Sequence, residues 1–102
     1  MSFTLLILYE WKPGISAQRI EHHLAKIRAL AGRVPGINDV RVGPRTIAFG
    51  PDAQRWTHAG LMTFRDQSDY ETFGRSAAHD EIAPELVADL QNLLAVGMQS
   101  SD

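Results

Sequence analysis

The first strand predicted from the sequence is apolar on both of its faces. Within residues 3–11, the odd positions all carry apolar or aromatic side chains: Phe3, Leu5, Ile7, Tyr9 and Trp11. Among the even positions, Leu6 and Leu8 lie in the middle of the segment. Because side chains alternate between the two faces of a strand, the odd face is expected to pack on helices. The two leucines then require a cover on the other face as well.

The remaining elements follow from hydrophobic spacing and from turn residues. Ser16 and Asp66 are expected to cap the first two helices, while Pro84 predicts either a kink or a later start in the third. Residues 43–54 hold two glycines and two prolines and predict a long connection, with an extended piece at 46–49 as an option. Periodicity predicts helices over 17–31, over 66–77 and after 79, and further strands over 37–45, 56–65 and 93–98.

The order strand, helix, strand, strand, helix, strand is typical of a ferredoxin-like α+β fold with a four-stranded antiparallel sheet. Its helices all cover one face of the sheet. The other face is expected to carry apolar side chains from the first and third strands: Leu6, Leu8, Ala59 and Leu61. A bare apolar face is unusual for a monomer, so we predict a homodimer in which two such sheets form a dimeric α+β barrel. Residues 1–102 are expected to form a single domain.

Composition and charge narrow the possible classes of function. The chain has no cysteine, which excludes disulfides, thiolate metal sites and a cysteine nucleophile. The net charge is −2 and the basic residues are not clustered, so no nucleic-acid partner is expected. No apolar run is long enough to span a membrane, and no basic segment precedes the first apolar stretch as in a signal peptide. The sequence therefore predicts a cytoplasmic protein with neither a membrane nor a nucleic acid as partner.

Four segments of the chain form a family pattern. They are Trp11-Lys12-Pro13-Gly14, residues 34–43, residues 56–64 and Ser76-Ala77-Ala78-His79. In this order and spacing the chain resembles the stress-responsive dimeric α/β-barrel (Dabb) family, from about residue 3 to residue 98. The resemblance implies the same fold and dimer. Some members are aromatic polyketide cyclases, whose pocket lies between sheet and helices and uses two histidines and a tyrosine.

Only one of these three polar positions is retained in this chain. Leu5 lies where the cyclases carry a histidine on the first strand, and Phe73 lies where they carry a tyrosine on the second helix. His79 matches the histidine that opens the third helical segment, although Ser76-Ala77-Ala78 precedes it where the family has His-Pro-Ala. The resemblance implies a pocket, but the acid–base set of a cyclase is incomplete here.

The histidines have functional and structural interpretations. His79 is expected to be a general base or hydrogen-bond donor at the pocket mouth, or else to cap backbone groups at a helix junction. His58 either lines the pocket or, as we favour, bonds to nearby loop backbone. His23 lies on the apolar stripe of the first helix and either enters the cavity or is partly buried at its edge. The three lack the spacing of a metal site, so we predict no metal, and no cofactor motif is present.

Gly60, at the centre of the third strand, supplies no side-chain volume. We therefore predict an apolar cavity above Gly60, bounded by Leu5, Ile7, Tyr9, Leu24 and Ile27. The full set of predicted pocket residues is Leu5, Ile7, Tyr9, His23, Leu24, Ile27, His58, Gly60, Phe73 and Ile82, with His79 as the candidate catalytic residue.

The sequence leaves three functions open. The first is binding of a small, mostly apolar or aromatic molecule in this pocket, with cofactor-independent cyclisation or isomerisation as the associated chemistry. The second is a non-enzymatic structural homo-oligomer of the stress-protein type. The third, less well supported by the motif order, is a cofactor-free monooxygenase that would enlist Trp11 or Trp56.

Overall fold

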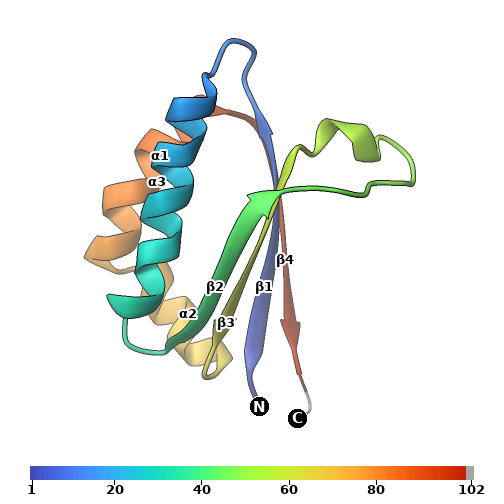
Figure 1. The fold of residues 1–102 in the computed structure, drawn as a ribbon. Helices are drawn as coiled ribbons and strands as arrows, with labels where there is room; N and C mark the ends of the chain where they lie inside the picture. Colours follow the sequence, from blue (N-terminus) through green and yellow to red (C-terminus); the bar gives the residue numbers. More distant parts are fainter. Residues whose placement is uncertain (101–102) are drawn as a thin grey trace.

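The computed structural model describes residues 1–100, and its helices cover one face of a four-stranded antiparallel sheet (Figure 1). The helices are α1 (Ala17–Arg28), α2 (Gln67–Gly74) and α3 (Ala77–Asp89). The strands are β1 (Phe3–Trp11), β2 (Ile37–Pro44), β3 (His58–Phe64) and β4 (Leu90–Gln99), arranged in the order β2-β3-β1-β4. This arrangement confirms the predicted ferredoxin-like α+β fold.

Side-chain caps determine where the helices begin. The Ser16 hydroxyl accepts a hydrogen bond from the Arg19 amide at 3.0 Å, and the Asp66 carboxylate accepts one from the Asp69 amide at 2.8 Å. Both predicted caps are therefore present. The third helix begins at residue 77 and contains Pro84 in its interior, so the predicted alternative of a helix that starts at Pro84 was wrong.

In residues 1–100, no helix has the length and hydropathy that a bilayer crossing requires.

The helix-facing side of the sheet holds the protein core. Phe3 lies opposite Phe64 in the β1–β3 register, and both side chains are buried, as is Tyr9. Phe64 has no exposed surface, and its ring centroid lies 5.5 Å from that of Tyr70 and 5.9 Å from that of Phe73. The odd positions of the first strand therefore pack on the helices, as predicted.

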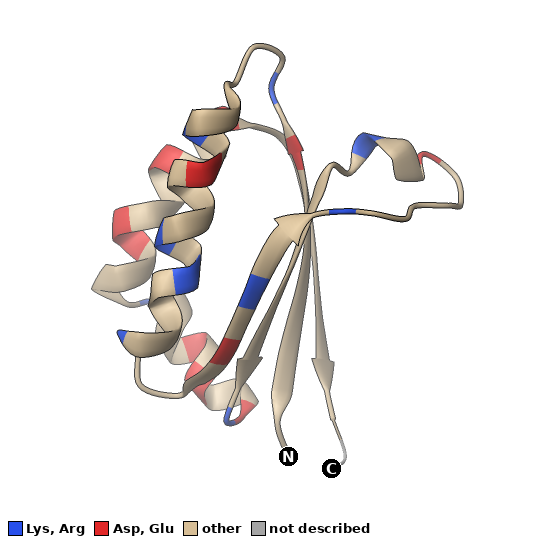
Figure 2. Cartoon of the chain, in the orientation of Figure 1, with Lys and Arg blue, Asp and Glu red and all other residues tan. Residues whose placement is uncertain are grey.

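The opposite side of the sheet, which we call the open face, is apolar and uncovered in the protomer. Register and alternation place seven apolar side chains on it: Leu6, Leu8, Ala59, Leu61, Leu94, Val96 and Met98. Leu6 is 42% exposed and Val96, its neighbour on β4, is 51% exposed. β3 and β4 contain no Lys, Arg, Asp or Glu, and Figure 2 shows most charges on the helices. At the β2 edge, the register places Asp39 and Arg41 on this face, where they pair with each other. The open face thus extends onto β4, which the sequence alone did not indicate.

Residues 45–57, which we call the arm, connect β2 to β3. The arm projects from the sheet on the side away from the helices (Figure 1). The optional extended piece at 46–49 is not a strand, and the only regular structure in the arm is a short 3-10 turn at Ala53–Arg55. The predicted long connection is therefore present, but as a projecting segment.

Candidate functional site

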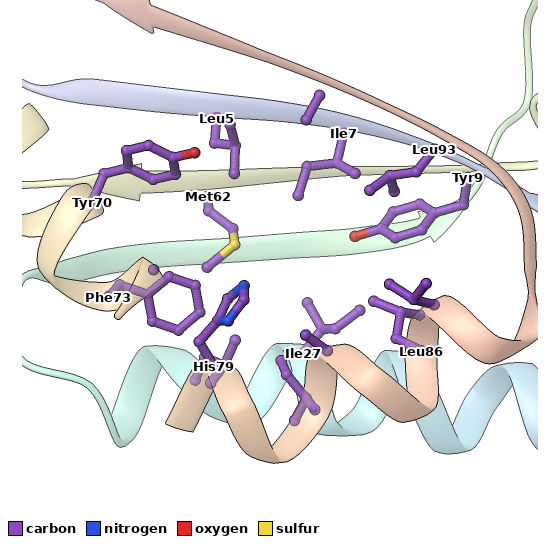
Figure 3. Close-up of a pocket in the computed structure, with 16 residues that line it drawn as sticks. Leu5, Ile7, Tyr9, Ile27, Met62, Tyr70, Phe73, His79, Leu86 and Leu93 are labelled. Carbon is purple, nitrogen blue, oxygen red and sulfur yellow. The ribbon is translucent and has the colours of Figure 1, made fainter. Parts of the chain in front are cut away.

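A cavity of about 310 Å³ lies between the helix-facing side of the sheet and the helices (Figure 3). The sixteen residues that line it come from β1, β3, β4, all three helices and the 3-10 turn Ala29–Gly32 that follows α1. None of these residues is Lys, Arg, Asp or Glu. Val87 and Leu93, on α3 and β4, are 59% and 47% exposed, so the cavity has an apolar rim between these two elements.

Three polar side chains face this apolar space: Tyr9 from β1, Tyr70 from α2 and His79 from α3 (Figure 3). Neither tyrosine hydroxyl is hydrogen-bonded to another group within residues 1–100. Burial raises the pKa of Tyr9 to about 12, so its phenol stays protonated near neutral pH. The cavity therefore offers a buried hydroxyl donor and an imidazole to a ligand with few polar atoms.

His79 is positioned by the junction between α2 and α3. The Ser76 hydroxyl accepts a hydrogen bond from the His79 amide at 3.2 Å and donates one to the Phe73 carbonyl at 2.6 Å. The imidazole meets the Phe73 ring edge-on, at a centroid distance of 5.3 Å. Its Nδ1 is buried without a hydrogen bond in the described chain, because the Asp80 carboxylate lies 3.7 Å away. Among residues 1–100, no carboxylate therefore accepts a hydrogen bond from this Nδ1 to orient the imidazole as in a catalytic triad.

Replacement of Ser76 by Ala is expected to lower the free energy of unfolding by about 1 kcal/mol, because it removes the cap of α3. The matched control is Ser16→Ala, which removes the cap of α1 and should cost a similar amount. Only Ser76→Ala should also shift the NMR signals of the His79 imidazole. Denaturant titration and imidazole NMR of both variants would check this, and unchanged His79 signals in Ser76→Ala would contradict it.

The structure brings seven of the predicted site residues together around the cavity: Leu5, Ile7, Tyr9, Ile27, Phe73, His79 and Ile82. The other four, His23, Leu24, His58 and Gly60, do not line it.

The prediction of a void above Gly60 was wrong. A Cβ atom built at Gly60 would lie 3.3 Å from the Tyr9 hydroxyl and 3.3 Å from Val42, so these side chains fill the space. The cavity lies instead toward α3 and β4.

The predicted set of cavity residues did not include Tyr70 or any residue of β4. Tyr70 precedes Phe73 by three residues in α2, so the two share a helix face, and this spacing could have identified it. Leu93 and Ala95 lie opposite Tyr9 and Ile7 in the β1–β4 register. Their place on the cavity wall depends on that register, which the sequence did not specify.

His23 belongs to a separate cluster where α1, α3 and β1 meet. The side chain is 3% exposed, and its Nε2 lies 2.6 Å from the Asp89 carboxylate. Its ring stacks on Trp11 at a centroid distance of 5.5 Å. Arg19 binds the same carboxylate at 2.7 Å, and the hydrogen bonds from His23 and Arg19 hold the pKa of Asp89 below its usual range. The partly exposed Asp89 carboxylate therefore provides the hydrogen-bond partner of the buried His23 imidazole, which does not enter the cavity.

His58 has a structural role as well. Its Nδ1 accepts a hydrogen bond from the Trp11 indole at 3.0 Å, and the Thr57 hydroxyl lies 3.0 Å from the same atom. Burial lowers the pKa of His58, with a smaller opposing effect from Glu21. A neutral imidazole is the form that can accept at Nδ1. The bond goes to Trp11 and not to loop backbone as predicted. Within residues 1–100, no group of three potential metal ligands comes together.

These features define a ferredoxin-like α+β domain with an uncharged cavity between sheet and helices and an uncovered apolar sheet face. The model of the stress responsive A/B barrel domain (Dabb) family matches residues 6–97. The chain belongs to this family, which confirms the resemblance found in the sequence. Comparison with curated proteins gives no significant match.

Solved structures with the same fold have low sequence identity to this chain. A protein from Arabidopsis thaliana has a TM-score of 0.87 at 19% identity, covering 98% of this chain and 96% of its own. Hydroxynitrile lyase from Passiflora edulis has a TM-score of 0.84 at 20% identity, and the match covers 99% of this chain and 95% of the lyase chain. A dimeric ferredoxin-like protein of unknown function from Jannaschia has a TM-score of 0.84 at 24% identity, and the match covers 98% of this chain and 100% of the Jannaschia chain. At these identities the likeness establishes the fold.

Proposed function

We propose that the protein is a homodimer that binds a small, uncharged and mostly apolar molecule in the cavity between sheet and helices. The observation that carries this proposal is an apolar cavity with three polar side chains and no charged wall residue. Its volume, about 310 Å³, is at the lower end of the range for ligand pockets. A flat aromatic or polyketide-like compound with one or two polar groups fits this description.

The associated chemistry is cofactor-independent proton transfer followed by cyclisation or isomerisation. His79 is the candidate general base, since its imidazole faces the cavity and can take up a proton from a bound molecule. The Tyr9 phenol, kept protonated by burial, is placed to donate a hydrogen bond to an oxygen that gains charge. The hydroxynitrile lyase of the same fold indicates that this architecture can hold an enzyme active site. Without an orienting carboxylate at His79, we expect a modest rate.

The homodimer is proposed to form through the open face. Its apolar side chains remain exposed in the protomer, with Leu94 at 45% and Met98 at 51%. The Jannaschia structure with this fold is described as dimeric, which supports a dimer here. The predicted interface residues Leu6, Leu8, Ala59 and Leu61 lie on this face together with the three apolar residues from β4.

The cytoplasmic location and the single-domain organisation stay predictions from the sequence.

One observation favours the alternative of a non-enzymatic structural homo-oligomer. Tyr9 fills the space above Gly60, which reduces the room for a ligand near the centre of the sheet. In this alternative the cavity binds nothing and the assembled oligomer is the functional unit. The monooxygenase alternative is weaker, because neither Trp11 nor Trp56 lines the cavity.

A fragment screen by thermal shift tests the proposal, using flat aromatic compounds against the wild type and His79→Ala. Compounds that stabilise the wild type are expected to stabilise His79→Ala much less. His22→Ala is the matched control, since His22 is a helix histidine outside the cavity and should respond like the wild type. Ala95→Phe, which places a ring in the cavity, should abolish the response. Binding unaffected by Ala95→Phe would show that the cavity is not the site.

A further inference from the structure

The arm carries the two most exposed large apolar side chains in residues 1–100. Ile47 is 78% exposed and Phe49 is 89% exposed. An exposed phenylalanine and isoleucine on one short segment leave apolar surface in water that contact with a partner would remove. The cavity does not use them, because neither residue lines it.

The arm is held in shape by its own hydrogen bonds. Arg45 donates to the Trp56 carbonyl at 2.7 Å and to the Gln54 side-chain oxygen at 2.9 Å. Gln54 in turn donates to the carbonyl of Ala48 at 3.0 Å, between Ile47 and Phe49. The apolar tip is therefore ordered before any partner binds, which lowers the entropic cost of docking.

The direction of the arm indicates where the partner lies. The arm leaves the sheet on the side opposite to the helices (Figure 1), which is the side of the open face. Two sheets that pack face to face lie about 10 Å apart. A second copy seated on the open face would therefore occupy the space into which the arm projects.

The open face is also asymmetric in a way that selects one orientation of the second copy. Large side chains line its β4 edge, where Leu94, Val96 and Met98 lie. Near the β2 edge, Gly43 lies opposite Ala59, and a shallow hollow of about 430 Å³ forms there, with small or aliphatic residues and Arg41 in its lining. A two-fold axis parallel to the strands places the β4 edge of one sheet over the β2 edge of the other, so large side chains face the hollow. A two-fold axis perpendicular to the strands would instead place the large side chains of one β4 edge against those of the other β4 edge.

The same orientation brings each arm to the partner. An axis parallel to the strands keeps both arms at the same end of the dimer, on opposite edges. Each arm then projects over the end of the partner's open face that carries the paired residues Leu8 and Leu94. We propose that Ile47 and Phe49 of each protomer dock on this end of the second copy, so that the two arms clasp the dimer. This inference rests on the proposed homodimer.

The test is the dimer dissociation constant of the double variant Ile47→Ser/Phe49→Ser, measured by sedimentation equilibrium. Loss of two buried interface anchors is expected to raise this constant by about tenfold or more. If the wild-type dimer is too tight for sedimentation, the rate of subunit exchange between fluorescently labelled protomers replaces the constant and should rise. Val87→Ser is the control, because it removes an exposed aliphatic group on α3, away from the open face.

The outcomes separate the arm from the dimer. An unchanged dissociation constant in a protein that is still dimeric would overturn the role of the arm and leave the homodimer standing. A monomeric wild type at micromolar concentration would overturn both. A second measurement uses the absence of cysteine: Thr46→Cys carries a single environment-sensitive fluorophore, whose emission should shift to the blue on dimerisation. Binding of wild-type arms to neutral lipid vesicles, with the dimer unaffected by the double variant, would assign the arm to a membrane surface and overturn the proposal.

Discussion

Leu6→Glu is expected to convert the protein from a dimer into a monomer. Leu6 lies on β1, a central strand, where Leu61 and Val96 flank it on the open face. A carboxylate there would be buried between two apolar sheets without a partner, which is strongly unfavourable. Loss of a central anchor costs roughly 2 kcal/mol or more, or about thirtyfold in the dissociation constant. Sedimentation equilibrium at several concentrations would measure the change.

The fold of the protomer should survive this substitution, because the Leu6 side chain is already 42% exposed in a single copy. Val87→Glu is the matched control. It places the same charge at an exposed aliphatic position on α3, away from the open face, and should leave the dimer intact. A Leu6→Glu protein that remains dimeric would show that the two copies meet through another surface.

Phe64→Ala is expected to lower the free energy of unfolding by about 3–5 kcal/mol. The Phe64 side chain has no exposed surface and packs among the rings of Phe3, Tyr70 and Phe73. Its removal both loses buried apolar area and leaves a cavity that three rigid rings cannot close. Since a domain has only about 5–15 kcal/mol of stability in total, a large part of the protein should unfold at moderate temperature.

Phe64→Leu distinguishes loss of filled volume from loss of the aromatic ring contacts. It retains most of the apolar volume at the same position and should cost much less than Phe64→Ala. Both variants are compared by denaturant unfolding at one protomer concentration, because the stability of a dimer depends on concentration. Equal costs for Ala and Leu would mean that the ring contacts, and not the filled volume, determine the stability of this cluster.

The fold could be predicted from the sequence because its strongest signals are local. Alternation in residues 3–11 separated the two faces of β1, and Ser16 and Asp66 set the starts of α1 and α2. These patterns depend on neighbours within a few residues, and no distant contact overrides them. The sequence-based expectation of a partner on the Leu6 face likewise needed only the pattern of apolar residues in the first and third strands.

The site was predicted less completely because it depends on long-range register and on rotamers. Gly60 did signal missing volume, but the Tyr9 hydroxyl from the adjacent strand occupies it. His23 was a reasonable pocket candidate from its helix stripe, yet Asp89, sixty-six residues away, binds it. Which distant side chain reaches a given space is decided by three-dimensional packing, and a single sequence does not encode it in any simple pattern.

The two faces of β1 allow substitutions but oppose insertions as this protein changes over evolutionary time. Alternate residues serve the cavity wall and the open face, so a substitution at Ile7 can alter what the cavity accepts while Leu6 remains unchanged. The number of residues in the strand has no such freedom. Insertion of one residue would exchange the two faces for every position beyond it. The lining of the cavity can therefore change by substitution, whereas the length of the first strand is held fixed by both faces at once.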